Sequence, residues 1–187
     1  MIQKRGSENG MKKKRYFYIK SGTLYDKTTD KACASIRNIS LGPDKKILSS
    51  DGKTEMRVMI ENSDPEDPDD LNGRRYQLKN SQGDIVMSGH PRYSEEEDFE
   101  TGAYAINRLP KVDHCDVHIK EDYDLIMHNC QNYSLFDHKG KEALRIMHKG
   151  IAGGWDIEEE EAFSFEEILG LFMFSRYIEK ENEYMII

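Results

Sequence analysis

Histidine, cysteine and aspartate side chains are most concentrated between residues 113 and 118, where the sequence reads Asp-His-Cys-Asp-Val-His. If this segment is a strand, His114, Asp116 and His118 share one face, and the residues between them share the other. At the usual rise per residue, the two histidines then lie roughly 13 Å apart, which is too far for both to bind one zinc ion. We therefore favour surface or hydrogen-bonded histidines in this segment.

A second pair, His128 and Cys130, is spaced like two metal ligands, but no further pair at ligand spacing follows it. Cys130 is also a weak candidate for a nucleophile, because no helix start is predicted beside it to stabilise a thiolate. The alternative function is a metal-binding protein or an enzyme that uses this pair together with His114 and His118. We expect no metal site, no cofactor and no catalytic residue.

Two further patterns lack parts that catalysis or phosphate binding requires. The glycine-rich segment 150–154 has neither the Lys-Ser/Thr ending nor the following helix of a phosphate-binding loop. It is better explained as a turn that lets Trp155 dock on the rest of the fold. Carboxylates are abundant, but they cluster in loops without apolar neighbours that would raise a pKa. We lean towards a protein that is not an enzyme.

Basic residues beside aromatic ones are the best candidates for ligand binding. Arginine forks match the geometry of phosphate groups, so the sharper hypothesis is a site for an anionic headgroup. Ordinary surface charge is the interpretation that the residues alone favour. The candidate ligand-binding residues are Arg74, Arg75, Arg92, Arg108 and Lys111.

The overall composition limits the classes of partner. The net charge is −8, with 33% charged residues, and this balance argues against non-specific binding of nucleic acid, although a local basic patch can still form. Three cysteines are too few for a disulfide framework, and no secretory signal is visible, so we expect reduced thiols and a cytoplasmic location. No apolar stretch reaches the roughly 20 residues of a membrane span. The oligomeric state stays open.

Three β-hairpins are predicted by short alternating runs on either side of an Asp/Asn-Gly type turn. In the strand after the first turn, Met56, Val58 and Ile60 share one face, as the strand period of two requires. Acidic segments between the strands, such as 158–161, are expected to be solvated loops. The predicted turns lie at residues 51–52, 80–83 and 137–140.

A helix over residues 165–178 is apolar on nearly every side, so it must be surrounded by protein. Ser164 and Glu167 form a capping box at its start, and Phe163 and Ile168 form a hydrophobic staple around it. We expect the helix to end over residues 179–182 and a closing strand to follow over 183–187. Residues 1–15 read as a flexible basic arm and residues 16–187 as one domain.

This order of elements resembles the tubby C-terminal fold, which is shared with phospholipid-scramblase-like and LURP-one-related proteins. Segments 90–93, 107–114, 127–133 and 153–156 are similar to segments of bacterial tubby-like proteins. The resemblance implies a closed antiparallel barrel of about twelve strands wrapped around the hydrophobic C-terminal helix. It also implies a non-enzymatic binding or regulatory module that recognises anionic lipid headgroups, as tubby proteins bind phosphoinositides, or a protein partner. Lipid scrambling does not carry over, because the acylated and calcium-binding segments of scramblases have no counterpart here.

Overall fold

The structure is a computed structural model that describes residues 14–39, 42–63, 71–94, 112–129 and 131–183. In these residues, twelve antiparallel strands form a closed barrel in which each strand pairs with the next one along the chain and the last pairs with the first. This confirms the predicted barrel class. The strands are β1 (Arg15–Lys20), β2 (Thr23–Asp26), β3 (Ala32–Asn38), β4 (Lys45–Ser49), β5 (Glu55–Asn62), β6 (Arg74–Lys79), β7 (Ile85–Tyr93), β8 (Val112–His118), β9 (Asp122–Asn129), β10 (Asn132–Asp137), β11 (Glu142–His148) and β12 (Trp155–Glu159).

The three predicted hairpins are confirmed as β4–β5, β6–β7 and β10–β11. In each turn an Asp or Asn side chain accepts a hydrogen bond from a backbone N–H two residues further on; Asp51 accepts from Lys53 at 3.0 Å. The glycine that ends each turn has a positive φ, for example 70° at Gly52. Local side-chain bonds and glycine thus explain why these turns were visible in the sequence.

Strand alternation places apolar side chains inside the barrel. In β5, Val58 is fully buried, and Met56 and Ile60 pack against the core, as predicted. Arg57 and Glu61, which belong to the alternating outer set, are exposed on the outer wall. One acidic segment departs from its prediction, because β12 extends through Glu159 and buries that side chain completely.

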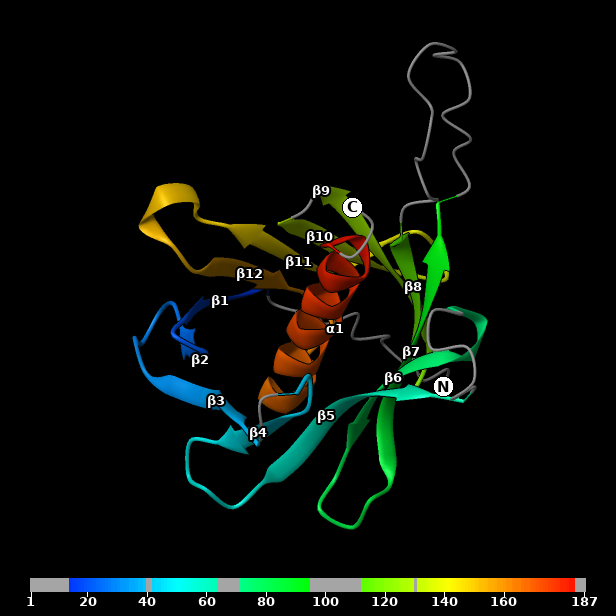
Figure 1. Ribbon diagram of the computed structural model, residues 1–187. Helices are drawn as coiled ribbons and strands as arrows, with labels where there is room; N and C mark the ends of the chain where they lie inside the picture. The colour runs from blue at the N-terminus through cyan, green and yellow to red at the C-terminus, as the bar shows by residue number, and fades with distance from the viewer. Residues whose placement is uncertain (1–13, 40–41, 64–70, 95–111, 130, 184–187) are drawn as a thin grey trace, which may run out of the picture.

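Helix α1 (Phe165–Glu183) runs through the middle of the barrel (Figure 1). Its start is the predicted capping box: the Glu167 backbone N–H donates to the Ser164 hydroxyl (3.1 Å), and the Ser164 N–H donates to the Glu167 carboxylate (2.7 Å). Every residue from 168 to 175 is buried, so no side of this stretch faces solvent. The prediction of a helix enclosed around its whole circumference is confirmed for residues 168–175, whereas Phe165, Glu167 and Arg176 nearer the ends are only partly buried. Burial of about seven such side chains contributes on the order of 10–20 kcal/mol before entropy is counted.

Two glycines allow α1 to lie close to the wall. A Cβ at Gly89 of β7 would be 2.9 Å from Cys115 Sγ and 2.9 Å from the Phe174 ring. A Cβ at Gly170 of α1 would be 3.0 Å from Leu78 Cδ2. The absence of a side chain at both positions therefore sets the distance between the helix and strands β6–β8.

The start of α1 is held by a group of polar contacts that we call the N-terminal clamp, formed by Arg15, Glu159 and Phe163. The buried Glu159 carboxylate accepts from Arg15 Nε (2.6 Å) and from the Phe163 backbone N–H (3.0 Å). Arg15 Nη2 also donates to the Phe163 carbonyl (2.6 Å). Strands β1 and β12 are thereby joined to Phe163, two residues before the helix.

The other end of α1 is held by the C-terminal clamp, formed by Arg74, Tyr76, Val112, Glu181 and Asn182. Arg74 makes an ion pair with Glu181, and the Tyr76 hydroxyl also donates to Glu181 (3.3 Å). Asn182 accepts from the Val112 N–H (3.0 Å) and donates to its carbonyl (2.8 Å). These contacts hold the last turn in helical form.

The helix therefore reaches residue 183, the first residue of the predicted closing strand, while 184–187 lie outside the described residues. At the other terminus, β1 begins at Arg15, the last residue of the predicted arm, and residues 1–13 are likewise not described. Among the described residues, no helix is both long and apolar enough to cross a membrane.

Candidate functional site

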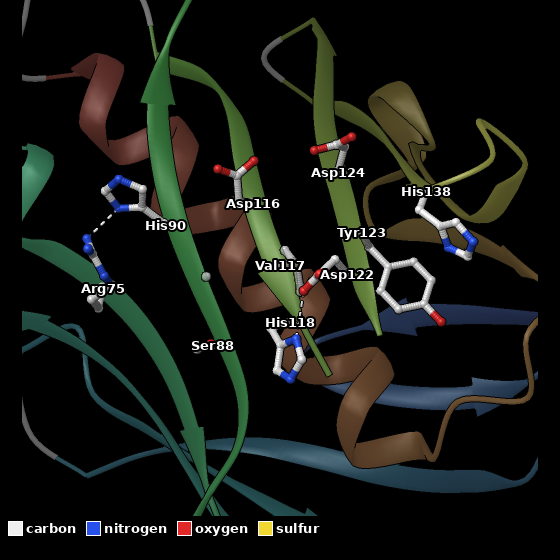
Figure 2. A pocket seen from close by; sticks show the side chains of 11 residues that line it. Arg75, Ser88, His90, Asp116, Val117, His118, Asp122, Tyr123, Asp124 and His138 are labelled. Carbon is white, nitrogen blue, oxygen red and sulfur yellow. Dashed lines mark hydrogen bonds and ion pairs between the residues drawn. The ribbon is translucent and has the colours of Figure 1, made fainter. Parts of the chain in front are cut away.

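A cavity of about 390 Å³ opens on the outer wall of the barrel over strands β6–β9. We call it the outer groove, and Figure 2 shows the side chains that surround it. Its size falls within the range of small-ligand sites, which runs from about 300 to 1,000 Å³. The residues that line it are Arg75, Ser88, Gly89, His90, Asp116, Val117, His118, Asp122, Tyr123, Asp124 and His138.

Strand register brings the polar side chains of the outer groove together. His90 of β7 lies opposite Asp116 of β8, which in turn lies opposite Asp124 of β9. Two residues along, Ser88, His118 and Asp122 form a second row of the same kind. Alternate residues of each strand point outwards, so the two rows lie side by side on the outer wall.

The groove contains more acidic than basic groups. Asp116 and Asp124 lie directly opposite each other, and Arg92 Nη2 lies 2.6 Å from the first and 3.6 Å from the second. Because like charges in cross-strand positions repel, this guanidinium stabilises the pair. Asp122 adds a third carboxylate against the two guanidinium groups of Arg75 and Arg92. The groove therefore has one excess negative charge when its histidines are neutral.

The histidines and tyrosine of the groove have definite partners or surroundings. His118 donates from Nδ1 to Asp122 (2.7 Å), and Arg75 donates to Nδ1 of His90. Tyr123 lies opposite the buried Val117 and packs edge-on against Phe163, with ring centroids 5.6 Å apart, so it borders the groove from the inner face of β9. Partial burial raises the pKa of Tyr123 above its ordinary value. The groove combines acceptors, aromatic surface and a guanidinium, a mixture suited to a polar or basic ligand.

The predicted ligand-binding arginines separate onto two faces of the wall. Arg75 lines the outer groove. Arg92 lies at the edge of the groove, where it forms an ion pair with Asp116. Arg74 belongs to the C-terminal clamp at the end of α1, where its side chain is largely buried against Glu181. Arg108 and Lys111 lie outside the described residues. Only two of the five predicted residues are therefore brought together by the described strands.

The predicted metal-ligand segments form three separate hydrogen-bonded groups. His114 bonds Asp113, His118 bonds Asp122, and His128 donates to the Ser134 hydroxyl (2.9 Å). No group of three or more His, Cys, Asp or Glu residues converges on one point within the part of the chain that the structure describes, and Cys130 lies outside that part.

The predicted faces of β8 are confirmed. Cys115 and Val117 are buried inside the barrel, whereas the neighbouring Asp116 and His118 line the outer groove. Burial raises the pKa of the Cys115 thiol well above its ordinary value, so this cysteine is a neutral core residue.

The glycine-rich segment 150–154 serves as the turn that the sequence suggested. After it, Trp155 packs edge-on against Phe172 of α1, with ring centroids 4.9 Å apart. Arg176 lies over the Trp155 ring at 5.3 Å. The expectation that this turn docks the tryptophan is confirmed.

Four acidic and aromatic residues of the groove, Asp122, Tyr123, Asp124 and His138, were not predicted as site residues. They lie on β9 or in a turn, and β9 pairs with β8 through residues 119–121, which contain no glycine or asparagine. The alternation Asp-Tyr-Asp-Leu was a usable signal for an outward-facing acidic edge. The sequence alone does not show which strands pair with β9, so it could not place these residues in one groove.

The fold is similar to that of a known structure. The match to the X-ray structure of a protein from Arabidopsis thaliana, AT5G01750, covers 89% of this chain and 92% of the Arabidopsis chain. The TM-score is 0.54 and the sequence identity is 11%. No family model matches the chain, and no curated protein matches it significantly. At this identity the likeness extends to the fold alone.

Proposed function

We propose that the protein is a non-enzymatic binding module of the tubby C-terminal-like class that accepts a basic side chain of a protein partner in its outer groove. The class is supported by the element order, in which a closed ring of strands is followed by one enclosed helix. Two buried, unpaired cysteines, Cys33 and Cys115, support a reducing, cytoplasmic setting.

The observation that supports the ligand class is the way Arg92 lies across Asp116 and Asp124. One guanidinium of this chain is already held by two carboxylates at the edge of the groove. Asp122, whose side chain is 87% exposed, extends the same acidic edge towards solvent. A partner arginine or lysine can bind there with its charged end against the acidic edge and its apolar stem near Tyr123, which borders the groove.

Titration of the full chain with a short arginine-rich peptide, followed by NMR, tests this function. We expect shifts confined to residues of the outer groove, and a citrulline analogue of the peptide, which lacks the charge, should produce none. The double variant Asp122→Asn/Asp124→Asn should lose most of the shifts. The matched variant Asp84→Asn, in the β6–β7 turn, should retain them. Shifts that are unchanged in the double variant would reject the groove as the site.

Recognition of anionic headgroups is a second candidate, favoured by the exposed Arg75 at the groove. Arg75 donates to the backbone carbonyls of Asn72 (2.8 Å) and Arg74 (2.7 Å) and to His90, which fixes its guanidinium at the surface. Flotation with vesicles that contain or lack a phosphoinositide, at low salt, tests it. Protein that stays in the unbound fraction with both vesicle types would reject this function.

A further inference from the structure

Four basic residues lie directly opposite one another across four neighbouring strands, away from the outer groove. Arg37 of β3 pairs with Lys46 of β4, Lys46 with Arg57 of β5, and Arg57 with Lys79 of β6. We call this set the basic row. It arises only from strand register, because its members are spread over more than 40 residues of sequence.

All four side chains belong to the outer wall. Their strand neighbours Ile36, Ile47, Val58 and Leu78 pack in the core, so alternation directs the basic row outwards. Arg37 and Arg57 are exposed, and Lys46 and Lys79 are partly so. The row therefore presents its charges to solvent.

Like charges at directly opposite positions destabilise a sheet, and the basic row contains three such pairs in succession. Two of its members have one carboxylate each: Arg57 Nη2 lies 2.8 Å from Asp44, and Lys46 Nζ lies 2.7 Å from Glu55. Both ion pairs are exposed to solvent, so they contribute little to stability and their carboxylates are readily replaced by those of a partner. For Arg37 and Lys79 there is no ion pair within the described residues.

The curvature of the basic row determines which kind of partner can contact all four charges. Neighbouring strands are about 4.8 Å apart, so the four charges span roughly 14 Å. The row follows the circumference of a closed barrel, and a flat bilayer cannot contact all of a convex arc at once. A flexible chain can follow this curve and place successive carboxylates against successive cations.

Apolar side chains lie next to the first and the last member of the basic row. Ile85, opposite Lys79, is 54% exposed, and Ile39, two residues after Arg37, is 38% exposed. We propose that the basic row and these two isoleucines bind an extended acidic segment of a protein partner that also carries apolar residues. This surface is separate from the outer groove, and it binds independently of the function proposed there.

Fluorescence anisotropy with a labelled oligoglutamate peptide bearing a leucine at each end tests the inference on the full chain. We expect saturable binding that weakens as salt is added, because exposed charges are screened. The variant Arg37→Gln/Lys79→Gln should weaken binding about fivefold or more, while Lys20→Gln/Lys120→Gln, with the same charge change at other exposed sites, should change it less than about twofold. The melting temperature of the row variant should be equal to or above that of the wild type, because repulsion is removed.

Three outcomes overturn the inference. The wild type does not bind the peptide, or both double variants weaken binding equally, which indicates a response to net charge alone. The third is that the row variant keeps its affinity for the peptide but loses binding to anionic vesicles or to a single-stranded oligonucleotide, which assigns the row to a bilayer or a nucleic acid.

Discussion

The described strands present two different surfaces, an inner one packed against α1 and an outer one that carries the outer groove and the basic row. The inner surface is apolar, and its polar contacts are concentrated in the N-terminal and C-terminal clamps. The outer surface combines opposite charges, exposed ion pairs and histidines with separate polar partners. The difference indicates that stability depends on the inner surface and binding on the outer one, so substitutions should separate the two properties.

The largest effect is expected from Phe174→Ala. Phe174 is completely buried and packs against Tyr76, with ring centroids 5.5 Å apart. The variant should lose about 3–5 kcal/mol of unfolding free energy, because a large cavity replaces the ring. Urea denaturation measures it. A loss below about 1 kcal/mol would contradict the view that the helix is enclosed by a tightly packed wall.

The N-terminal clamp should be more sensitive than an ion pair on the outer wall. Arg15→Met leaves the fully buried Glu159 without its cation and should cost about 2–3 kcal/mol, below the range for a wholly buried pair because Arg15 is partly exposed. The matched variant Arg145→Met breaks an exposed pair with Glu142 and should cost less than about 1 kcal/mol. Equal losses of unfolding free energy in the two variants, measured by denaturant titration, would show that stability does not depend more on the inner surface than on the outer one.

Gly89→Ala tests the close fit between β7 and α1. The added Cβ would meet Cys115 Sγ and the Phe174 ring at 2.9 Å, so the helix or wall must shift, at a cost of about 1–3 kcal/mol. Ser88→Ala, the adjacent outward-facing change, should stay within about 0.5 kcal/mol. Differential scanning calorimetry of both variants provides the comparison. A Gly89→Ala protein as stable as the wild type would mean that this glycine does not set the helix position.

The smallest effect concerns an exposed turn and depends on pH. Hydrogen bonds from Ser49 and the Lys53 backbone lower the pKa of Asp51 to about 2. A lowered pKa stabilises the folded state above the ordinary value near 3.8, and this stabilisation is lost as pH falls from there towards 2. The melting temperature of the wild type should therefore exceed that of Asp51→Asn at pH 6, and the gap should narrow below pH 4. A gap that is constant with pH would show that ionisation of Asp51 is irrelevant to the turn.

Local signals explain what the sequence could predict. Asp51, Asn80 and Asp137 bond to their own turns, and Ser164 and Glu167 cap their own helix, so each boundary is visible within a few residues. The enclosed helix was also predictable, because an all-apolar circumference leaves it no other environment.

Contacts between distant residues explain what was missed. The end of α1 depends on Asn182 bonding to Val112, 70 residues away, and the burial of Glu159 depends on Arg15, 144 residues away. The outer groove and the basic row depend likewise on which strands become neighbours. A spacing rule along the chain cannot show that Arg37 and Lys79 share one row.

Closure of the ring through β1 and β12 has a consequence for synthesis. Arg15 pairs with Glu159, so the first strand stays without its second neighbour until almost the whole domain has left the ribosome. The helix that fills the interior is made later still. A nascent chain at that stage exposes an unpaired strand edge and an unfilled apolar lining, the two features that promote aggregation and chaperone capture.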